Sequence, residues 1–186
     1  MSASAQKAIF TSLHQDYNTP REFLDPLEKA FGQVGLDPCS NEFSKVGARV
    51  EYRFERGENG LELPWNGFGL VFMNNPYDDM LRWWRKHAIE REDQDFECIA
   101  LVPHRTDTEW YQDYAATCDA KVEWRGRLHF PRVMVPGPQL ALFEGPSPSE
   151  EEDAGPSTFP AVGLYWGPRV RRFAHGFAPH GVVWSR

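Results

Sequence analysis

The sequence predicts an α/β fold with a mostly parallel sheet and an antiparallel C-terminal hairpin. Short apolar runs bounded by breakers, typical of buried strands, alternate along the chain with segments of helical periodicity. Such alternation favours parallel strands joined by right-handed crossovers. The 186 residues, 41% of them hydrophobic, have the length of about one domain and can fill a core. We therefore expect a single domain over residues 1–186, with an N-terminal extension over residues 1–15.

The first predicted helix begins at the sequence Thr19-Pro20-Arg21-Glu22. Thr19 suits the N-cap, Pro20 suits the first helical position, and an acidic side chain follows three residues after the cap. Apolar residues then recur at four-residue intervals as far as Phe31, and Gly32 can end the helix. The pattern predicts a helix over residues 20–31, weakened by the proline at position 26.

The elements that follow are predicted from apolar runs and their breakers. A short strand over residues 34–36 leads into Asp37-Pro38-Cys39-Ser40, and residues 50–54 alternate like a second strand. Residues 133–158, rich in Pro, Gly, Ser and Glu, are expected to form a flexible acidic loop, and the final stretch, after residue 166, reads as irregular. The remaining strands are expected over residues 70–73, 96–102, 121–124 and 159–166, and helices over residues 80–91 and 108–116.

The turn Asn74-Asn75-Pro76-Tyr77 directly follows a predicted strand, at the position where parallel α/β sheets bind ligands. An Asn side-chain oxygen and a backbone carbonyl can accept both hydrogens of a ring-bound amine, which frees the lone pair of its nitrogen for attack. Tyr77 can stack on the ring, and Pro76, with its fixed φ, stiffens the turn. The pattern favours a site that holds a flat, amine-bearing substrate, although such residues also occur in ordinary loops.

Composition excludes several classes of protein. No run of eighteen apolar residues is present to span a membrane, and the first residues lack the apolar core of a secretion signal. The three widely spaced cysteines form no Cys-x-x-Cys pair, which indicates a reducing cytoplasm rather than a disulfide framework. Neither they nor the six histidines show metal-ligand spacing. We expect a cytoplasmic protein without a metal site.

Charge permits a nucleic-acid partner without demanding one. A net charge of −7 argues against a protein that simply coats nucleic acid. The charge is uneven, however, because residues 135–158 carry five acidic and no basic residues, whereas residues 159–186 carry four arginines and no acidic residue.

Six short motifs succeed one another along the chain. Four of them occupy residues 16–20, residues 36–40, residues 58–61 with Trp65, and residues 74–77. The other two, Arg105-Thr106-Asp107-Thr108-Glu109-Trp110 and Arg125-Gly126-Arg127-Leu128-His129-Phe130, are unusual strings and therefore the most specific. Over about residues 16–166 this succession resembles the small phage-type DNA adenine methyltransferases, the phage Dam family.

The resemblance implies a Rossmann-like methyltransferase core, S-adenosylmethionine as cofactor with S-adenosylhomocysteine as product, and N6 of adenine in DNA, expected as a duplex, as methyl acceptor. It implies that Asn74 accepts a hydrogen bond from the target amine, that Asn75 adds its backbone carbonyl, and that Tyr77, after Pro76, stacks on the base. A duplex hides that amine, so base flipping is also required physically. The residues implied for the cofactor pocket are Thr19, Pro20, Asp37, Pro38, Cys39, Ser40, Glu58 and Asn59.

The chain departs from the family pattern in two places. The family motif that the 74–77 turn resembles is Asp/Asn-Pro-Pro-Tyr. Asn75 stands where that motif has its first proline, so the backbone carbonyl is kept while the ring is lost. No Gly-x-Gly loop follows the first predicted strand, and Asp37-Pro38-Cys39-Ser40 must serve instead. Cys39 is expected to be a small filler rather than a nucleophile.

Candidate DNA contacts lie in the two most specific motifs. Arg105 and Asp107 follow a predicted strand and so share a sheet edge with Asn74; the alternative is that Thr106 or Asp107 caps the next helix. Arg125 and Arg127 alternate on a predicted strand and would both face either phosphate or solvent. The arginines of the final stretch present the same choice.

Three hypotheses of function follow. The leading one is an N6-adenine DNA methyltransferase of a phage or prophage, acting in the bacterial cytoplasm for restriction protection or regulation. A second keeps the chemistry but changes the acceptor to cytosine N4, an RNA base or a protein glutamine, whose enzymes also use Asn/Ser-Pro-Pro-aromatic turns. A third is a catalytically weak relative that binds DNA, motivated by Asn75 and the acidic charge. The target sequence and the oligomeric state stay open.

Overall fold

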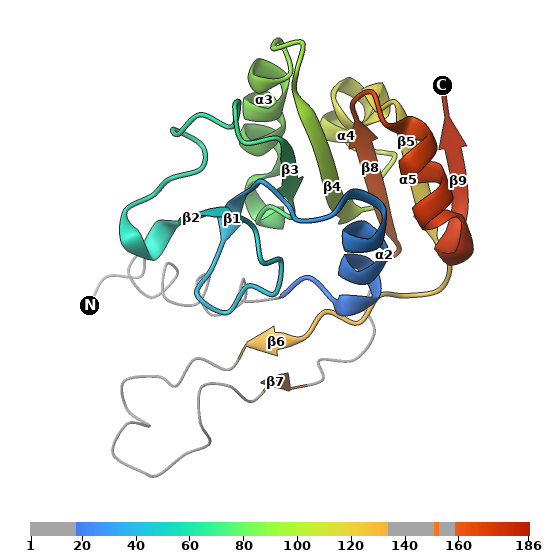
Figure 1. The fold of residues 1–186 in the computed structure, drawn as a ribbon, viewed down its shortest axis with the longest axis horizontal. Helices are drawn as coiled ribbons and strands as arrows, with labels where there is room; N and C mark the ends of the chain where they lie inside the picture. Colours follow the sequence, from blue (N-terminus) through green and yellow to red (C-terminus); the bar gives the residue numbers. More distant parts are fainter. Residues whose placement is uncertain (1–17, 134–150, 153–158) are drawn as a thin grey trace.

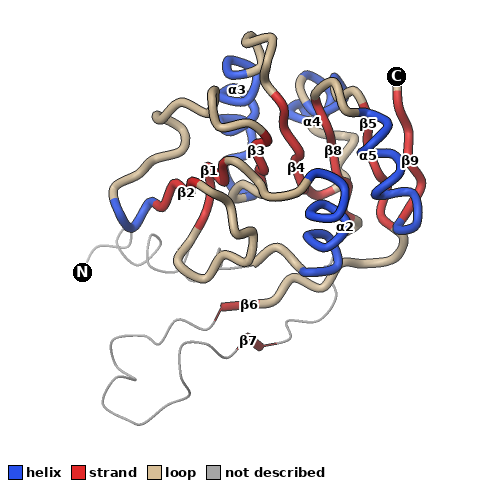
Figure 2. The backbone as a smooth tube through the Cα atoms, viewed as in Figure 1, coloured by secondary structure: helices blue, strands red, loops and turns tan. Residues whose placement is uncertain are grey.

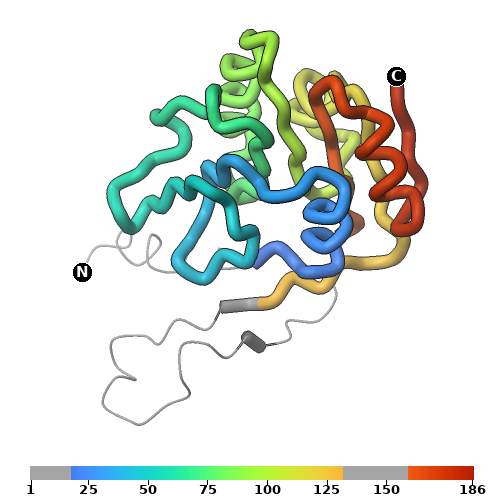
Figure 3. The backbone as a smooth tube through the Cα atoms, in the orientation of Figure 1, coloured from blue at the N-terminus to red at the C-terminus, as the bar shows by residue number. Residues whose placement is uncertain are grey.

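The computed structural model describes residues 18–133, 151–152 and 159–186. Within these ranges the chain forms a seven-stranded sheet of order β2-β1-β3-β4-β8-β5-β9 (Figure 1). Its first half builds the β2-β1-β3 side, and its last part builds the β8 and β9 side (Figure 3). The strands are β1 (Leu36–Ser40), β2 (Val50–Arg53), β3 (Leu70–Met73), β4 (Glu97–Pro103), β5 (Ala120–Trp124), β8 (Ala161–Trp166) and β9 (Gly181–Ser185).

Helices cover both faces of the sheet (Figure 2). Alternate residues of β3 belong to different cores: Leu70 and Phe72 pack with α2 and α5, and Val71 and Met73 pack with α3 and α4. Because both faces are covered, β3 and β4 are buried over their whole length, as their continuous apolar runs predict. The helices are α2 (Arg21–Phe31), α3 (Met80–Glu90), α4 (Glu109–Asp113) and α5 (Val170–Phe177), with short 3-10 turns η1 (Phe54–Arg56), η2 (Tyr77–Asp79), η3 (Ala115–Thr117) and η4 (Ala178–His180).

The direction of the strands gathers their carboxyl ends on one edge. β2, β1, β3 and β4 are parallel neighbours, and β8 is antiparallel to both β4 and β5. β5 therefore points the same way as β4, and the ends of these five strands share what we call the carboxyl edge. In Figure 1 this edge faces downward, toward the pair formed by β6 (Arg132–Val133) and β7 (Glu151–Glu152). The α/β class and the mostly parallel core are confirmed.

The prediction of an antiparallel C-terminal hairpin is wrong. β8 lies between β4 and β5 and pairs with both, so the only side of β5 still open is its outer one. β9 pairs there, antiparallel to β5, after α5 has carried the chain across (Figure 1). The two antiparallel strands thus flank β5 instead of pairing with each other.

The final stretch is also regular, contrary to the prediction, because it forms α5 and β9. Gly176 obscures this in the sequence, since glycine is a poor helix former. In the fold, however, a Cβ at Gly176 would lie only 2.6 Å from the Cβ of Ala30 in α2. The close approach of α2 and α5, which lie side by side in Figure 2, explains the glycine.

Most other predicted elements are confirmed within one or two residues, including the first helix, the strand before residue 74 and the helix after it. Two differ more: the strand expected over residues 34–36 is β1, which contains the 37–40 motif instead of preceding it, and the helix expected over residues 108–116 ends at residue 113, followed by η3. The expected N-terminal extension and most of the expected acidic loop lie outside the described residues; within the loop, Val133 and Glu151–Glu152 belong to the antiparallel β6–β7 pair. Of the helices described, none has the length and apolar character needed to cross a membrane.

Candidate active site

The carboxyl edge brings together motifs that are far apart in the sequence. β1 contains residues 37–40, residues 74–77 follow β3, and residues 105–107 follow β4; β3 lies between β1 and β4 in the sheet. The backbone N–H of Asn74 lies within hydrogen-bonding reach of the Cys39 sulfur, so the ends of β1 and β3 touch. The structure therefore places the predicted cofactor motif beside the predicted catalytic turn.

The side-chain amide of Asn74 is held at both ends. Its Nδ2 donates a hydrogen bond to Oγ1 of Thr19 over 3.0 Å, and the Tyr77 hydroxyl donates to its Oδ1 over 3.3 Å. Thr19 is 5% exposed, whereas Tyr77 is 36% exposed. The nitrogen of the amide thus faces the protein interior, and the oxygen lies on the side of the exposed aromatic ring.

Thr19 is not the N-cap of α2, and that prediction is wrong. The cap residue is Pro20, which makes no side-chain cap bond, and its carbonyl accepts the backbone N–H groups of Phe23 and Leu24. The helix starts one residue later than predicted, which leaves Thr19 in the preceding segment with its hydroxyl on Asn74.

Asn75 is buried, with 2% of its surface exposed. Its Nδ2 donates to the carbonyl oxygen of Pro76 over 2.9 Å and to the sulfur of Met80, the first residue of α3, over 3.1 Å. A side-chain bond across the turn, anchored to a helix, therefore constrains the chain where the family motif has a proline ring.

Asp37, the second residue of β1, carries a buried carboxyl group. The backbone N–H of Cys39 donates to its Oδ1 over 3.1 Å, and the hydroxyl of Ser44 donates to its Oδ2 over 3.4 Å. Burial raises the pKa of Asp37 to about 7, and the nearby charge of Glu51 adds to the rise. The carboxyl is therefore partly protonated at neutral pH, and a cation placed beside it would favour its charged form.

The Cys39 thiol stays protonated. Burial raises its pKa well above the ordinary value, and the neighbouring Asp37 carboxyl raises it further. A protonated thiol is a poor nucleophile, which agrees with the prediction that Cys39 fills space. Among the residues that the structure describes, no three His, Cys, Asp or Glu side chains come together as a metal-binding group.

A glycine, Gly60, holds the 58–60 loop against the middle of β1. A Cβ at Gly60 would lie 1.9 Å from the carbonyl oxygen of Pro38, and the indole N–H of Trp65 donates to the carbonyl of Gly60 over 2.7 Å. Glu58 and Asn59 are thereby placed next to residues 37–40. The glycine within this motif is a visible signal in the sequence, but no local pattern reveals its partner.

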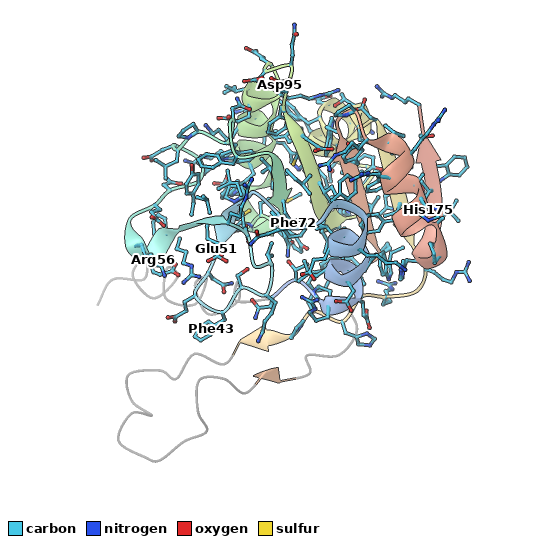
Figure 4. All side chains as sticks on the ribbon, viewed as in Figure 1. Phe43, Glu51, Arg56, Phe72, Asp95 and His175 are labelled. Carbon is cyan, nitrogen blue, oxygen red and sulfur yellow. The ribbon has the colours of Figure 1, made fainter. Side chains whose placement is uncertain are left out.

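Glu58 and Asn59 also make local contacts that shape their loop. A carboxylate oxygen of Glu58 accepts the backbone N–H of Arg53 over 3.1 Å, and Nδ2 of Asn59 donates to Glu62 over 2.8 Å. The Asn59 Oδ1 accepts the backbone N–H of Leu61. Figure 4 shows Arg56 of η1, just before this loop, at the left of the molecule, and Asp95, which precedes β4, at its top.

Arg105 and Asp107 form an exposed pair at the carboxyl edge. Nε of Arg105 lies 3.1 Å from Oδ1 of Asp107, and a second guanidinium nitrogen lies 3.1 Å from Oδ2. The alternative that Thr106 or Asp107 caps the next helix is wrong, because the N-cap of α4 is Thr108 and no side-chain cap bond is made. The pair is therefore positioned to meet a ligand that approaches this edge.

Arg125 and Arg127 do not alternate on a strand, contrary to the prediction. β5 ends at Trp124, and Gly126 adopts a φ of +82°, which turns the chain. Both arginines are exposed in this turn, and because β5 is parallel to β4 the turn lies at the carboxyl edge. The arginines of the final stretch lie at the opposite edge, where Arg169 bonds to Glu97 at the start of β4.

Tyr77 also contacts Phe159, a residue that is not predicted from the sequence to belong to the site. The ring of Phe159, just before β8, lies 5.5 Å from the Tyr77 ring in an edge-to-face arrangement. The contact arises because β8 begins at the carboxyl edge, a consequence of its antiparallel direction. No local pattern marks a contact between residues 82 positions apart.

Comparison with known proteins assigns the chain to a family. Residues 7–141 match the family model described as DNA N-6-adenine-methyltransferase (Dam). The chain belongs to the Dam family. The Dam match contains the motifs at the ends of β1, β3, β4 and β5, and it confirms the resemblance seen in the sequence.

A curated relative supports the same assignment. Over 108 residues, or 58% of the chain, the protein is 29% identical to a DNA N-6-adenine-methyltransferase of Escherichia phage T1. The aligned part spans 43% of the length of that relative. No solved structure matches this Dam-family chain.

Proposed function

We propose that the protein transfers a methyl group from S-adenosylmethionine to N6 of adenine in DNA. The observation that carries this proposal is the amide oxygen of Asn74, held at the carboxyl edge beside the partly exposed Tyr77 and the end of β1. Membership of the Dam family and the name of the phage T1 relative support the acceptor. The sheet, with antiparallel β8 between parallel strands, is compatible with a Rossmann-like methyltransferase core.

The 74–77 turn supplies the contacts to the base. We assign Oδ1 of Asn74 as acceptor for one amine hydrogen and the backbone carbonyl of Asn75 as acceptor for the other. Tyr77 stacks on a base flipped out of the duplex, with Phe159 against its ring. The amine nitrogen loses its proton as or after the new bond forms, so these residues need to align and desolvate it rather than act as a strong base.

The cofactor pocket is assigned to the residues beside this turn. When bound, S-adenosylmethionine supplies a methyl group on a positively charged sulfur. The buried carboxyl of Asp37, with its raised pKa, fits a cationic ligand, because a nearby positive charge offsets the cost of its ionisation. The contact of Gly60 with Pro38 holds the loop that carries Glu58 against β1, which supports a place for Glu58 in the same pocket. The full set that we assign is Thr19, Pro20, Asp37, Pro38, Cys39, Ser40, Glu58 and Asn59.

The DNA contacts are assigned to the arginines of the carboxyl edge. Arg105, which pairs with Asp107, follows β4, the neighbour of β3. The exposed Arg125 and Arg127 follow β5, which ends at the same edge two positions beyond β4 in the sheet. Positive side chains at this edge suit the phosphates that flank a flipped base. We further propose that the protein is a phage or prophage product that acts in the bacterial cytoplasm, as the phage T1 relative suggests.

The substitution Asn74→Ala tests the proposal. It removes the amine acceptor, so we expect methyl transfer to fall at least about 100-fold, as for the loss of one well-placed catalytic hydrogen bond, while cofactor binding changes only a few-fold. Asn66→Ala is the matched control, because Asn66 precedes β3 at the opposite edge and bonds to the carbonyl of Glu90. Loss of cofactor binding in Asn74→Ala, measured by calorimetry, would show that its assigned role is wrong.

A further inference from the structure

The two ends of an asparagine amide have opposite hydrogen-bonding character. Only the oxygen can accept a hydrogen bond from an amine, while the nitrogen can only donate. The neighbour that holds one end of Asn74 therefore decides which end meets the substrate. In the structure that neighbour is Thr19, whose Oγ1 accepts from Nδ2 over 3.0 Å.

We infer that Thr19 is a positioning residue that fixes the amide of Asn74 with its oxygen toward the target amine. This inference rests on the proposed function and adds a role for Thr19 besides its place in the cofactor pocket. The hydroxyl acts through Asn74 and need not touch the base.

The position of Thr19 is set by backbone bonds on either side of it. The N–H of Asn18 donates to the carbonyl of Pro131 over 3.0 Å, and the carbonyl of Pro20 accepts the first two N–H bonds of α2. The hydroxyl is thus fixed in a buried segment that lies 55 residues from Asn74 in the sequence. A fixed, buried acceptor is well suited to hold one end of an amide in a single orientation.

Tyr77 cannot supply this constraint during the reaction. Its hydroxyl bonds to Oδ1 of Asn74 over 3.3 Å in the structure, so an amine that binds to Oδ1 must compete with or displace it. Tyr77 is also partly exposed, and a phenol can donate or accept. Without an acceptor at position 19, the amide can turn its nitrogen toward Tyr77 and present the wrong end to the base.

The variants Thr19→Val and Thr19→Ser separate orientation from cofactor binding. Valine keeps the shape without the acceptor, and we expect kcat to fall roughly 10- to 100-fold, because the correct orientation then leaves a partly buried N–H group unpaired. The Thr19 hydroxyl is bonded to Asn74, so its part in the cofactor pocket depends on its shape, which valine keeps, and the dissociation constant for S-adenosylhomocysteine should stay within about threefold. Serine should restore kcat to within about threefold of the natural value, since it restores the hydroxyl. Thermal unfolding of each variant checks that it folds.

The effect of Thr19→Val in a variant with a carboxylate at position 74 is the decisive comparison. Asn74→Asp presents two equivalent acceptor oxygens and needs no orienting partner. Adding Thr19→Val to Asn74→Asp should therefore cost much less in kcat than adding it to the natural chain. Equal losses on both backgrounds would overturn the inference, as would a loss of cofactor affinity with an unchanged chemical rate.

An NMR readout keeps the inference testable apart from catalysis. The side-chain NH2 pair of Asn74, identified by its loss in Asn74→Asp, should shift and exchange faster in Thr19→Val but not in Thr19→Ser. If the natural protein fails to methylate adenine, the proposed function fails, and this measurement still reports on the Thr19–Asn74 contact. Unchanged Asn74 signals in Thr19→Val would contradict it.

Discussion

Asn75 shows how one side chain can replace the constraint of a proline ring. Its Nδ2 bonds to the carbonyl of Pro76 and to the sulfur of Met80, and Asn75→Pro would exchange those bonds for the ring. We expect Asn75→Pro to keep kcat within about threefold, whereas Asn75→Ala, which has neither constraint, should lose about tenfold, the equivalent of one hydrogen bond. A large gain of activity in Asn75→Pro would instead identify a catalytically weakened turn.

The raised pKa of Asp37 predicts an unusual dependence of the protein's stability on pH. The folded protein keeps a proton on this carboxyl up to about pH 7, while an unfolded chain releases it near pH 4. The folded state binds more protons between these values, so the contribution of Asp37 to stability is fully present below about pH 4 and is lost as the pH rises through 7.

Asp37→Asn should therefore stabilise the protein at alkaline pH while it weakens the cofactor site. At pH 8 we expect a gain in the free energy of unfolding on the order of 1 to 4 kcal/mol, and at pH 4 little change. Urea unfolding of the ligand-free protein at both pH values measures this difference. Equal effects of the substitution at pH 4 and pH 8 would show that Asp37 does not titrate as described.

Sequence reasoning finds the residues of the site more readily than the contacts between them. An apolar run followed by a breaker marks the 74–77 turn, because both features are local. The Thr19–Asn74 bond and the Tyr77–Phe159 contact join residues that no local pattern connects. The sequence even predicts a different task for Thr19, since a threonine before a proline and an acidic turn is typical of an N-cap.

At the scale of elements, the contact between the 58–60 loop and β1 carries a prediction about Gly60. Gly60→Ala would place a methyl group 1.9 Å from the carbonyl oxygen of Pro38, so loop and strand must separate. We expect a loss of about 1 to 3 kcal/mol in stability and about a tenfold loss in affinity for S-adenosylhomocysteine.

Gly35→Ala is the matched control for this experiment. A Cβ at Gly35 would likewise lie 1.9 Å from a backbone oxygen, that of Phe68, but Gly35 precedes β1 and so lies at the opposite edge. Gly35→Ala should destabilise the protein to a similar degree and leave the affinity of the folded protein unchanged. Similar losses of affinity in both variants would mean that the loop contact does not shape the pocket.

The elements are predictable where burial gives a continuous or periodic apolar pattern, as in α2, β3 and β4. α5 is not predicted because it contains Gly176, and glycine is a poor helix former. The glycine is required there by the close packing against Ala30 of α2. Arg125 and Arg127 are wrongly predicted to lie on a strand, because the same alternation of residue types can occur in a turn. The positive φ of Gly126 distinguishes the turn from a strand, and it is seen only in the structure.

At the scale of the whole molecule, strand order decides which arginines face the site. β8 and β9 cannot be ordered from local pattern, since their places depend on which strand edges remain open after the others pair. The result puts Arg125 and Arg127 at the carboxyl edge and Arg172, near the start of α5, at the other.

Removal of the edge arginines should weaken DNA binding in a salt-dependent manner. For Arg125→Ala combined with Arg127→Ala, we expect a lower affinity for duplex DNA and a salt dependence of log K reduced by roughly 1 to 2 units, about 0.9 for each phosphate that is no longer neutralised. Arg172→Ala is the matched control and should leave both quantities unchanged. Equal effects of the double variant and the control in fluorescence anisotropy titrations would locate the DNA elsewhere.

The decisive experiment for the proposed activity is methyl transfer from labelled S-adenosylmethionine to unmethylated duplex DNA, followed by digestion to nucleosides and mass analysis. We expect label in N6-methyl-2′-deoxyadenosine from the DNA, and none with Asn74→Ala. Label in N4-methylcytosine, in RNA or in a glutamine side chain under matched conditions would contradict the proposed acceptor. No label in any of them, with cofactor binding demonstrated, would contradict the proposed activity itself.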